Sequence, residues 1–420
     1  MNEGNFERDG VKLHYLEWNG DESSRPAVLL LHGLSSNAAF WSRTAALLPR
    51  RRMVALDQRA HGSSSAPAAG YDPAILAADA AALVERLGLG RVAVAGHSWG
   101  ASIALQLAAD RPDLVAGLAI IDGPVRPWSE LGMTWEQAAR VLQPPLPKYP
   151  ALEDAIEEKR RFLRESWGDD LAGFVRSGLV ADGTGLRLPL TAPIRLEILR
   201  SMFFQPYDVL WAQVRCPVLL ALADGDSGPF LDSKRRSAQV ISEQVPGTVV
   251  HWHRSGHDIP IHLPGAIAEE ITRLCLRAGL ADVTAEIAGL EGDWQAPTGY
   301  QDWTAKDLLA HLSSSQAALP AISRSRPTAV EPGEPFDSGR WNASQVRRRK
   351  ETPAADLKLE LESAGVEMDR LLAELSVSEP VAAGTHAGLV AGDALQKMVE
   401  HQRDHLSELR RTLGSPASSP

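Results

Sequence analysis

The residues best suited to covalent chemistry lie in a short stretch around Ser98. This serine is the centre of a G-x-S-x-G pattern with Gly96 and Gly100, after the β-branched and small-residue run 92–95 and before an apolar segment of helical character. A strand, a sharp turn and a helix in this order hold the serine in a strained backbone conformation and expose its hydroxyl at the positive end of the helix. The pattern and its context predict that Ser98 is a nucleophile.

A histidine and one of several aspartates could activate that hydroxyl. A serine is a poor nucleophile until a base takes its proton, and the side chain that titrates near neutral pH is histidine. His257 follows a late predicted strand in a glycine-bearing loop, where its imidazole can reach over the edge of a sheet. A carboxylate must then fix the tautomer of the imidazole. Asp224 and Asp226 follow the preceding predicted strand and Asp122 follows an earlier one, so all three are candidates for the acid.

The elements that must position these side chains follow the pattern of an α/β protein. Residues 6–18 predict two strands around Asp9-Gly10, a dipeptide favoured in tight hairpin turns. Further strands, apolar on both faces, alternate with helical segments, which predicts a doubly wound, mostly parallel sheet covered by helices on both sides. These strands are predicted at 26–31, 53–56, 92–95, 114–121, 217–222 and 248–252. From 125 to about 210 the alternation stops, and tryptophans, prolines and charged helical stretches predict an inserted helical lid.

Length and composition restrict the class of protein. A chain of 420 residues is longer than a domain with a single hydrophobic core usually is, so two domains are expected. The net charge of -10 argues against nucleic acid or an anionic membrane as a partner. Cys216 and Cys275 adjoin apolar segments, which indicates small buried side chains rather than a disulfide. The N-terminus lacks an apolar core of signal-peptide length and no run approaches the ~20 residues of a membrane span, so a cytoplasmic protein is predicted.

Residues 1 to about 277 resemble the α/β-hydrolase superfamily. The matching segments, in the order and spacing of that family, are LLLHGLSSNAAFW, LDQRAHGSS, VAVAGHSWGASIALQLA, CPVLLALADGD and RSGHDIP. The resemblance implies a catalytic triad in the chain order serine, acid, histidine. Aligning Pro217 with the proline that precedes the corresponding strand of the family favours Asp226 as the acid, with Asp224 and Asp122 as alternatives. The resemblance also implies an oxyanion hole from the backbone N–H groups of Leu34 and Trp99.

The chain from residue 279 onward has a different pattern. Four helical stretches are separated by loops rich in proline, serine and glycine, which predicts an all-α four-helix bundle over 279–413. The predicted helices are 280–290, 305–322, 354–375 and 392–413, and residues 414–420 are predicted to be a disordered tail. The basic run 347–350 is interpreted as a solvated helix face.

Three histidines give the bundle its possible chemistry. Thr304 and Asp307 form a helix-start signature that places His311 two turns into a helix, and His401 and His405 are four residues apart and share a helix face. Histidines from two helices can converge inside a bundle and leave metal positions open for a substrate.

The stretches DWTAKDLLAHL and EHQRDHLSELR resemble the DinB-like metal-binding bundles, which include mycothiol-dependent maleylpyruvate isomerase. The resemblance implies that His311, His401 and His405 bind a divalent metal. The isomerase branch more often has glutamate where His401 stands, so this chain lies nearer the general DinB branch. A site of three imidazole ligands does not discriminate among zinc, nickel and iron. The open metal positions could hold a low-molecular-weight thiol as a thiolate.

Two functions from different classes follow from these patterns. The first is a serine hydrolase that cleaves a small, largely apolar ester, lactone or related carbonyl substrate by Ser98, Asp226 and His257 and requires no cofactor in that domain. The alternative is a metal- and thiol-dependent transferase or isomerase with its chemistry in the bundle. A bundle that serves to form a homodimer, or to shield the hydrolase pocket, is a third interpretation.

Overall fold

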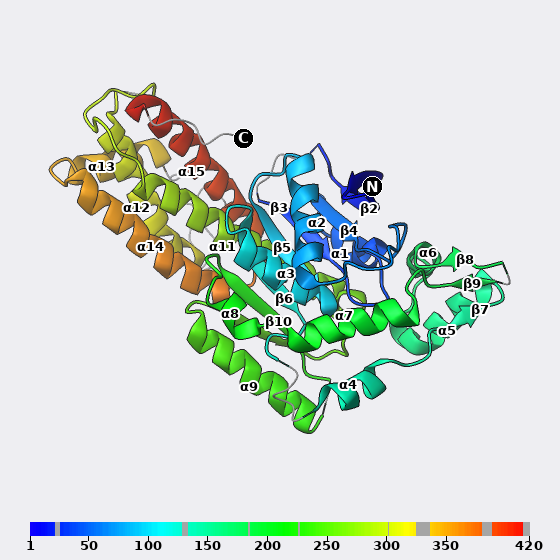
Figure 1. Cartoon of the computed structure of the whole chain (residues 1–420). Coiled ribbons are helices and arrows are strands. Elements are labelled where there is room, and N and C mark those ends of the chain that lie inside the picture. Colours follow the sequence, from blue (N-terminus) through cyan, green and yellow to red (C-terminus); the bar gives the residue numbers. More distant parts are fainter. Residues whose placement is uncertain are drawn as a thin grey trace. The chain divides into compact units, whose positions relative to one another are not determined.

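The computed structural model describes residues 1–420 except 22–25, 128–132, 184, 226, 301, 325–336, 380–388 and 415–420. It divides into two compact units, Met1–Leu274 and Cys275–Pro420, each with its own hydrophobic core (Figure 1). The predicted acid Asp226 and the residues 415–420 of the predicted tail therefore lie outside the described residues. Among the described residues, no helix combines the length and the apolar character needed to cross a membrane.

The first unit is built on an eight-stranded sheet of order β1-β2-β4-β3-β5-β6-β10-β11. β2 pairs antiparallel with β1 and β4, and every other neighbouring pair is parallel. The predicted, mostly parallel sheet is thus confirmed. The strands are β1 (Asn2–Arg8), β2 (Val11–Trp18), β3 (Ala27–Leu31), β4 (Met53–Asp57), β5 (Val92–His97), β6 (Val115–Ile121), β10 (Val218–Ala223) and β11 (Val249–His253).

Local sequence explains the central strands and the hairpin. Every residue of β3, β4, β5, β6 and β10 is buried, as expected for parallel strands with helices on both faces. Asp9 and Gly10 have φ values of 51° and 75°, so both central residues of the turn between β1 and β2 are left-handed. That geometry matches the twist of the two strands, and the sequence predicted this hairpin.

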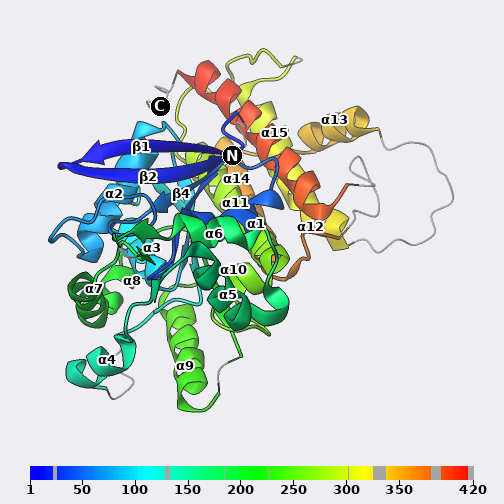
Figure 2. The same cartoon turned by 90° about the vertical axis from the view of Figure 1, so that its right-hand side faces the viewer.

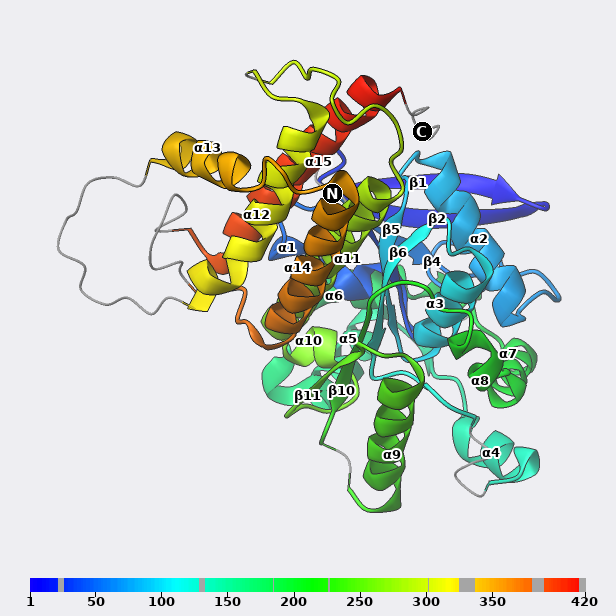
Figure 3. The same ribbon diagram turned by 90° about the vertical axis from the view of Figure 1, so that its left-hand side faces the viewer.

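Helices cover both faces of the sheet. One row of helices, α2 (Pro73–Arg86), α3 (Trp99–Asp110) and α8 (Tyr207–Trp211), packs together on one side. Figure 3 shows this row on one side of the sheet and α1 (Ser42–Ala46) and α10 (Ile259–His262) on the other. Trp99 and Leu107 of α3 and Leu118 of β6 belong to one continuous core of buried residues. The helix after Ser98 is therefore fixed against the sheet along its length.

The segment predicted as a lid is mainly helical. Its helices are α4 (Trp135–Leu142), α5 (Leu152–Leu163), the 3-10 turn η3 (Arg164–Ser166), α6 (Leu171–Ser177) and α7 (Ala192–Phe204). It also holds a small sheet of order β7-β9-β8, from β7 (Lys148–Tyr149), β9 (Leu186–Arg187) and β8 (Val180–Ala181), which the sequence pattern did not predict. Another 3-10 turn, η1 (Ala38–Trp41), and the helix α9 (Pro229–Gln244) complete the unit.

The second unit is helical, as predicted. Its helices are the last part of α11 (Pro264–Ala288), α12 (Ala305–Arg324), α13 (Ser338–Arg348), α14 (Ala354–Glu374) and α15 (Ala391–Leu413). Figure 2 shows α12 and α15 side by side. The sequence placed a helix at 280–290, most of which lies within α11, and assigned no helix to the start of α13. Gly279 lies within α11, where it leaves space for Val399: a Cβ on Gly279 would lie 2.8 Å from a methyl carbon of that side chain.

Candidate active site and histidine cluster

Ser98 lies at the junction of β5 and α3 with a strained backbone. Its φ of 54° and ψ of -122° fall in a region that L-residues rarely occupy. The flanking glycines are required by close approach, because a Cβ on Gly96 would lie 2.3 Å from the carbonyl oxygen of Gly100, and a Cβ on Gly100 would lie 2.3 Å from that of Leu31. Ser98 itself is partly exposed, and its hydroxyl donates no hydrogen bond to any residue that the structure describes. Such a turn presents a hydroxyl for attack.

His257 is held by Asp122. Its Nδ1 atom lies 2.7 Å from Asp122 Oδ2, and the aspartate follows β6, the strand beside the one that ends at Ser98. The sequence favoured Asp226 as the acid, but Asp226 lies outside the described residues. Among the described residues, the partner of Nδ1 is Asp122, one of the two alternatives. The physical reason is that β6 lies between β5 and β10, so a residue at its carboxyl end reaches the same edge of the sheet. Asp224 instead donates its backbone N–H to the His253 carbonyl.

Lys234 contacts the other oxygen of the same carboxylate. Its Nζ atom lies 2.7 Å from Asp122 Oδ1 and 3.0 Å from the carbonyl oxygen of Ala223, whose own N–H donates to Oδ1 at 2.9 Å. The Asp122 side chain is 1% exposed, and its partners keep the carboxylate ionised. Burial by itself would raise the pKa of Asp122, but His257, Lys234 and the Ala223 N–H lower it below its usual value. The sequence analysis missed Lys234, since a lysine inside an amphipathic helix carries no local signal.

Two opposing effects act on the imidazole of His257. Burial lowers its pKa, whereas the hydrogen bond and charge of Asp122 raise it, and the net result is a pKa above the ordinary value. More than half of the His257 side chain is exposed, so solvent screens part of this effect. His97 also fixes this loop, because its Nε2–H donates to the His257 carbonyl at 3.0 Å. The His97 ring is buried, which lowers its pKa to about 4 and keeps it neutral.

The loop after β3 carries one predicted oxyanion donor. Gly33 lies against the nucleophile, since a Cβ on it would be 3.0 Å from Ser98 Cβ. Neither the Leu34 nor the Trp99 N–H donates to another described residue, and that of Trp99 is the first of its helix. His61 accepts a hydrogen bond from the Ser35 N–H through its Nε2 atom at 3.1 Å. Burial lowers the pKa of His61 to about 3, so the ring is neutral and can accept. It therefore holds the loop in place.

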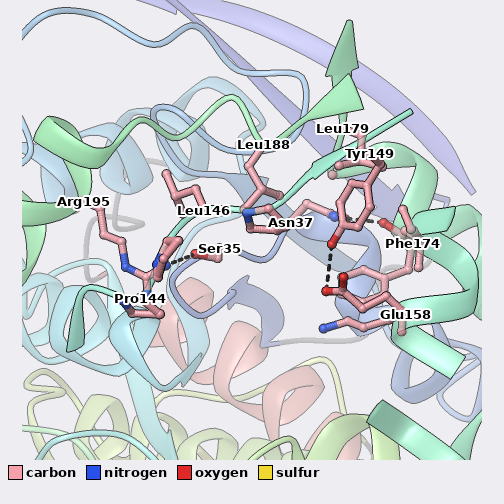
Figure 4. Close-up of a pocket in the computed structure, with 16 residues that line it drawn as sticks. Ser35, Asn37, Pro144, Leu146, Tyr149, Glu158, Phe174, Leu179, Leu188 and Arg195 are labelled. Atoms are coloured by element: carbon pink, nitrogen blue, oxygen red, sulfur yellow. Dashed lines mark hydrogen bonds between the residues drawn. The ribbon is translucent and has the colours of Figure 1, made fainter. Parts of the chain in front are cut away.

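A pocket of about 220 Å³ lies between this loop and the lid. Ser35 and Asn37 come from the loop, and the lid supplies prolines and leucines with three charged residues, Glu158, Lys159 and Arg195. Figure 4 shows Arg195 beside Ser35 at one end and the Tyr149–Glu158 hydrogen bond at the other. Ser98 and His257 are not among its lining residues. The pocket thus adjoins the loop that reaches the nucleophile without including the reacting atoms.

In the second unit, His311, His401 and His405 come together as predicted. The Nε2 atom of His401 lies 3.1 Å from that of His311 and 3.1 Å from that of His405. His311 and His405 are buried, whereas His401 is exposed. Burial and the neighbouring imidazoles lower the pKa of His311 to about 4 and that of His405 to about 3, so both rings are neutral.

The donor set of this cluster fits a metal ion. Three Nε2 atoms face one another, and each neutral imidazole can offer one lone pair there. A cation among them would use all three lone pairs. The Nδ1 atom of His311 lies 3.4 Å from Ser315 Oγ, a contact that would orient the ring. In contrast, the buried Nδ1 atom of His405 has no partner in the part of the chain that the structure describes.

Comparisons with known proteins agree with this division. A family model for the alpha/beta hydrolase fold matches residues 26–160, and a model for the mycothiol maleylpyruvate isomerase N-terminal domain matches residues 276–406. The fold and the Ser98 turn define the first unit as an α/β-hydrolase domain. The two matches support the fusion of two domains that the resemblances implied, and the second falls on the mycothiol maleylpyruvate isomerase N-terminal domain rather than on a general DinB model.

Individual relatives are similar to the first unit. A 2-(acetamidomethylene)succinate hydrolase of Mesorhizobium japonicum is 39% identical over 103 residues, 24% of this chain and 37% of that protein. A protein of Caulobacter sp. (strain K31) named as a carbamate hydrolase, RutD, is 27% identical over 60% of this chain and 92% of its own length. The first relatives are thus matched over little more than a third of their length. A solved E-2-(acetamidomethylene)succinate hydrolase is 22% identical with a TM-score of 0.54, over 65% of this chain and 98% of that chain, and it supports the fold.

Proposed function

We propose that the first unit is a serine hydrolase that acts on a small, largely apolar ester, lactone or related carbonyl compound. The observation that carries the proposal is the strained Ser98 turn on the same sheet edge as the His257–Asp122 pair. The hydrolase names of the relatives support the reaction class. In this reaction the Ser98 hydroxyl loses its proton to His257 Nε2 while its oxygen attacks the substrate carbonyl. The hydroxyl makes no hydrogen bond to another described residue, and such contacts often tighten only when substrate binds.

The remaining steps follow from the same residues. The negative charge on the carbonyl oxygen is stabilised by the N–H groups of Leu34 and Trp99, and the protonated His257 gives its proton to the leaving alcohol. Asp122 holds the histidine tautomer and stabilises the imidazolium. Water, activated by the neutral His257, then hydrolyses the acyl ester on Ser98 and regenerates the enzyme.

Labelling and turnover test this proposal together. A fluorophosphonate probe is expected to label Ser98 in the folded wild-type protein and not in Ser98→Ala, and the same substitution should abolish hydrolysis of 4-nitrophenyl butyrate. Heat-denatured wild-type protein is the control for nonspecific reaction. Labelling that persists in Ser98→Ala, with turnover unchanged, would refute Ser98 as the nucleophile.

We also propose that the second unit binds one divalent metal ion through His311, His401 and His405. The converging Nε2 atoms support this site, and zinc, nickel and iron are all compatible with three imidazoles. When bound, the metal would hold a low-molecular-weight thiol as its thiolate, consistent with the family match. The two neutral, buried rings would fix the metal and exclude water on their side, while His401 lies at the solvent boundary.

A thiol-dependent transferase or isomerase is the second candidate function. It is favoured by the histidine cluster and by the match of residues 276–406. If the principal chemistry is in the bundle, His401→Ala abolishes turnover of the physiological substrate and Ser98→Ala leaves it. The serine-hydrolase proposal predicts the opposite pair of results.

A further inference from the structure

The pocket beneath the lid contains the guanidinium of Arg195, which has no acidic partner among the described residues. Arg195 of α7 is partly buried, and its Nη1 and Nε atoms donate to Ser35 Oγ at 3.1 Å and to the Leu142 carbonyl at 3.3 Å. Among the residues that the structure describes, no carboxylate lies within ion-pair distance of Arg195. Both of its partners are neutral, whereas a partly desolvated guanidinium is best stabilised by an anion.

The other charged groups of the pocket do not neutralise Arg195. Glu158 accepts a hydrogen bond from the Tyr149 hydroxyl at 3.0 Å, at the opposite end of the pocket from Arg195 (Figure 4). Lys159 lines the pocket next to Glu158, and its ammonium lies 5.8 Å from the centre of the Phe174 ring. With one carboxylate and two cations, the lining has a net charge of +1, and the excess positive charge is at the Arg195 end.

The position of Arg195 connects it with the nucleophile. Its partner Ser35 lies two residues after Gly33, which packs against Ser98 Cβ. The Ser35 N–H is held by His61, and the His61 ring lies 5.1 Å from the ring of Trp99, the residue that follows the nucleophile. Between the two ends of the pocket the wall is formed by apolar side chains, among them those of Pro144, Leu146 and Leu188. A substrate chain that starts at Ser98 and follows this loop past Ser35 would meet the Arg195 guanidinium at the near end of the pocket.

We propose that the pocket binds substrates whose acyl chain ends in a carboxylate, which pairs with the Arg195 guanidinium and the Ser35 hydroxyl. The proposal rests on the serine-hydrolase function and narrows its substrate class to half-esters, or related monoacyl derivatives, of dicarboxylic acids. The fork of Arg195 matches a carboxylate with two parallel N–H donors.

Two esters of equal chain length test the proposal on the full-length protein. These are mono-4-nitrophenyl adipate and 4-nitrophenyl hexanoate, which differ in a terminal carboxylate and a terminal methyl group. We expect the wild-type kcat/KM to be higher for the adipate ester by about tenfold or more, the factor expected for a hydrogen bond to a charged group. Arg195→Met should remove this preference by lowering kcat/KM for the adipate ester alone, and Arg195→Lys should retain part of it.

Matched controls separate recognition from folding. Arg200→Met removes an exposed arginine of the same helix and should leave both esters unchanged. Equal wild-type rates for the two esters, or an equal loss on both in Arg195→Met, would overturn the proposal, because the arginine would then serve only to join lid and loop. If neither ester is hydrolysed and Ser98 is not labelled, the serine-hydrolase proposal fails. Calorimetric binding of adipate still tests the pocket: binding that Arg195→Met abolishes supports the carboxylate site, and no binding by the wild type refutes it.

Discussion

Lys234→Met removes a positive charge that contacts the Asp122 carboxylate and leaves Ser98, Asp122 and His257 unchanged. In the wild type the ammonium and the imidazole share the Asp122 carboxylate, each at 2.7 Å from a different oxygen. The positive charge of Lys234 opposes protonation of His257 and so lowers the pKa of His257. Removing that charge must therefore raise the pKa of His257 further above its ordinary value.

The size of the effect follows from the separation of the two cations across the carboxylate. Two unit charges roughly 7 Å apart interact by about 2 kcal/mol at an effective dielectric constant of 20, and by well under 1 kcal/mol in water. His257 is more than half exposed, so an intermediate value of about 1 kcal/mol is appropriate. This corresponds to a rise of about 0.5 to 1 pH unit in the pKa of His257. Because the base must be neutral to accept the serine proton, the acidic limb of kcat/KM should move to higher pH by that amount.

The assay is the pH profile of kcat/KM for a neutral 4-nitrophenyl ester, corrected for spontaneous hydrolysis. On the acidic side Lys234→Met should be about three- to tenfold slower than the wild type, and above the limb the two rates should converge. Arg235→Met, an exposed cation on the same helix, should leave the limb in place. An acidic limb that stays fixed or moves to lower pH, or a loss that is uniform at every pH, would refute the electrostatic role of Lys234.

Three further predictions follow from the structure. Asp122→Asn should lower kcat by about a thousandfold or more, the scale seen when the acid of a catalytic triad is lost. Asp226→Asn should keep a kcat within a few-fold of the wild type. If Asp226→Asn instead causes the larger loss, Asp226 is the acid. His405→Ala should abolish the binding of one equivalent of metal, measured by elemental analysis, while hydrolysis of a 4-nitrophenyl ester is unchanged; full metal content in the variant would reject the cluster as a site. Asp79→Asn should lower the free energy of unfolding by about 3 to 5 kcal/mol, because it leaves the buried Arg59 guanidinium unpaired, and urea unfolding with a loss under 1 kcal/mol would contradict this.

Patterns within single segments of the sequence were sufficient to predict much of this fold. The apolar runs at β3, β4, β5, β6 and β10 marked parallel strands because residues buried on both faces leave no polar alternation in the sequence. The Asp9-Gly10 turn and the glycines around Ser98 were also readable, since each satisfies a local backbone requirement. The three histidines of the bundle could be selected by helical spacing, because i and i+4 positions share a face.

The carboxylate that contacts His257 could not be predicted from local pattern. Asp122, Asp224 and Asp226 each follow a strand, and the sequence cannot specify which of these chain ends lies nearest to His257. In the structure, the position of β6 between β5 and β10 brings Asp122 to the histidine. Lys234 and Arg195 were missed for the same reason. Their roles depend on partners that are 112 and 160 residues away along the chain.

The sequence by itself determined the two domain types, the strained serine turn and the histidines suited to bind a metal, because these depend on periodicity and on neighbours close in the chain. Only the tertiary structure decided which carboxylate holds His257, that a lysine shares it, and that Arg195 lines a pocket beside the loop at Ser98. The physical reason is that charged and hydrogen-bonding groups interact according to their distance in space and not their separation along the chain. Sheet order and lid packing, which no local pattern encodes, set those distances.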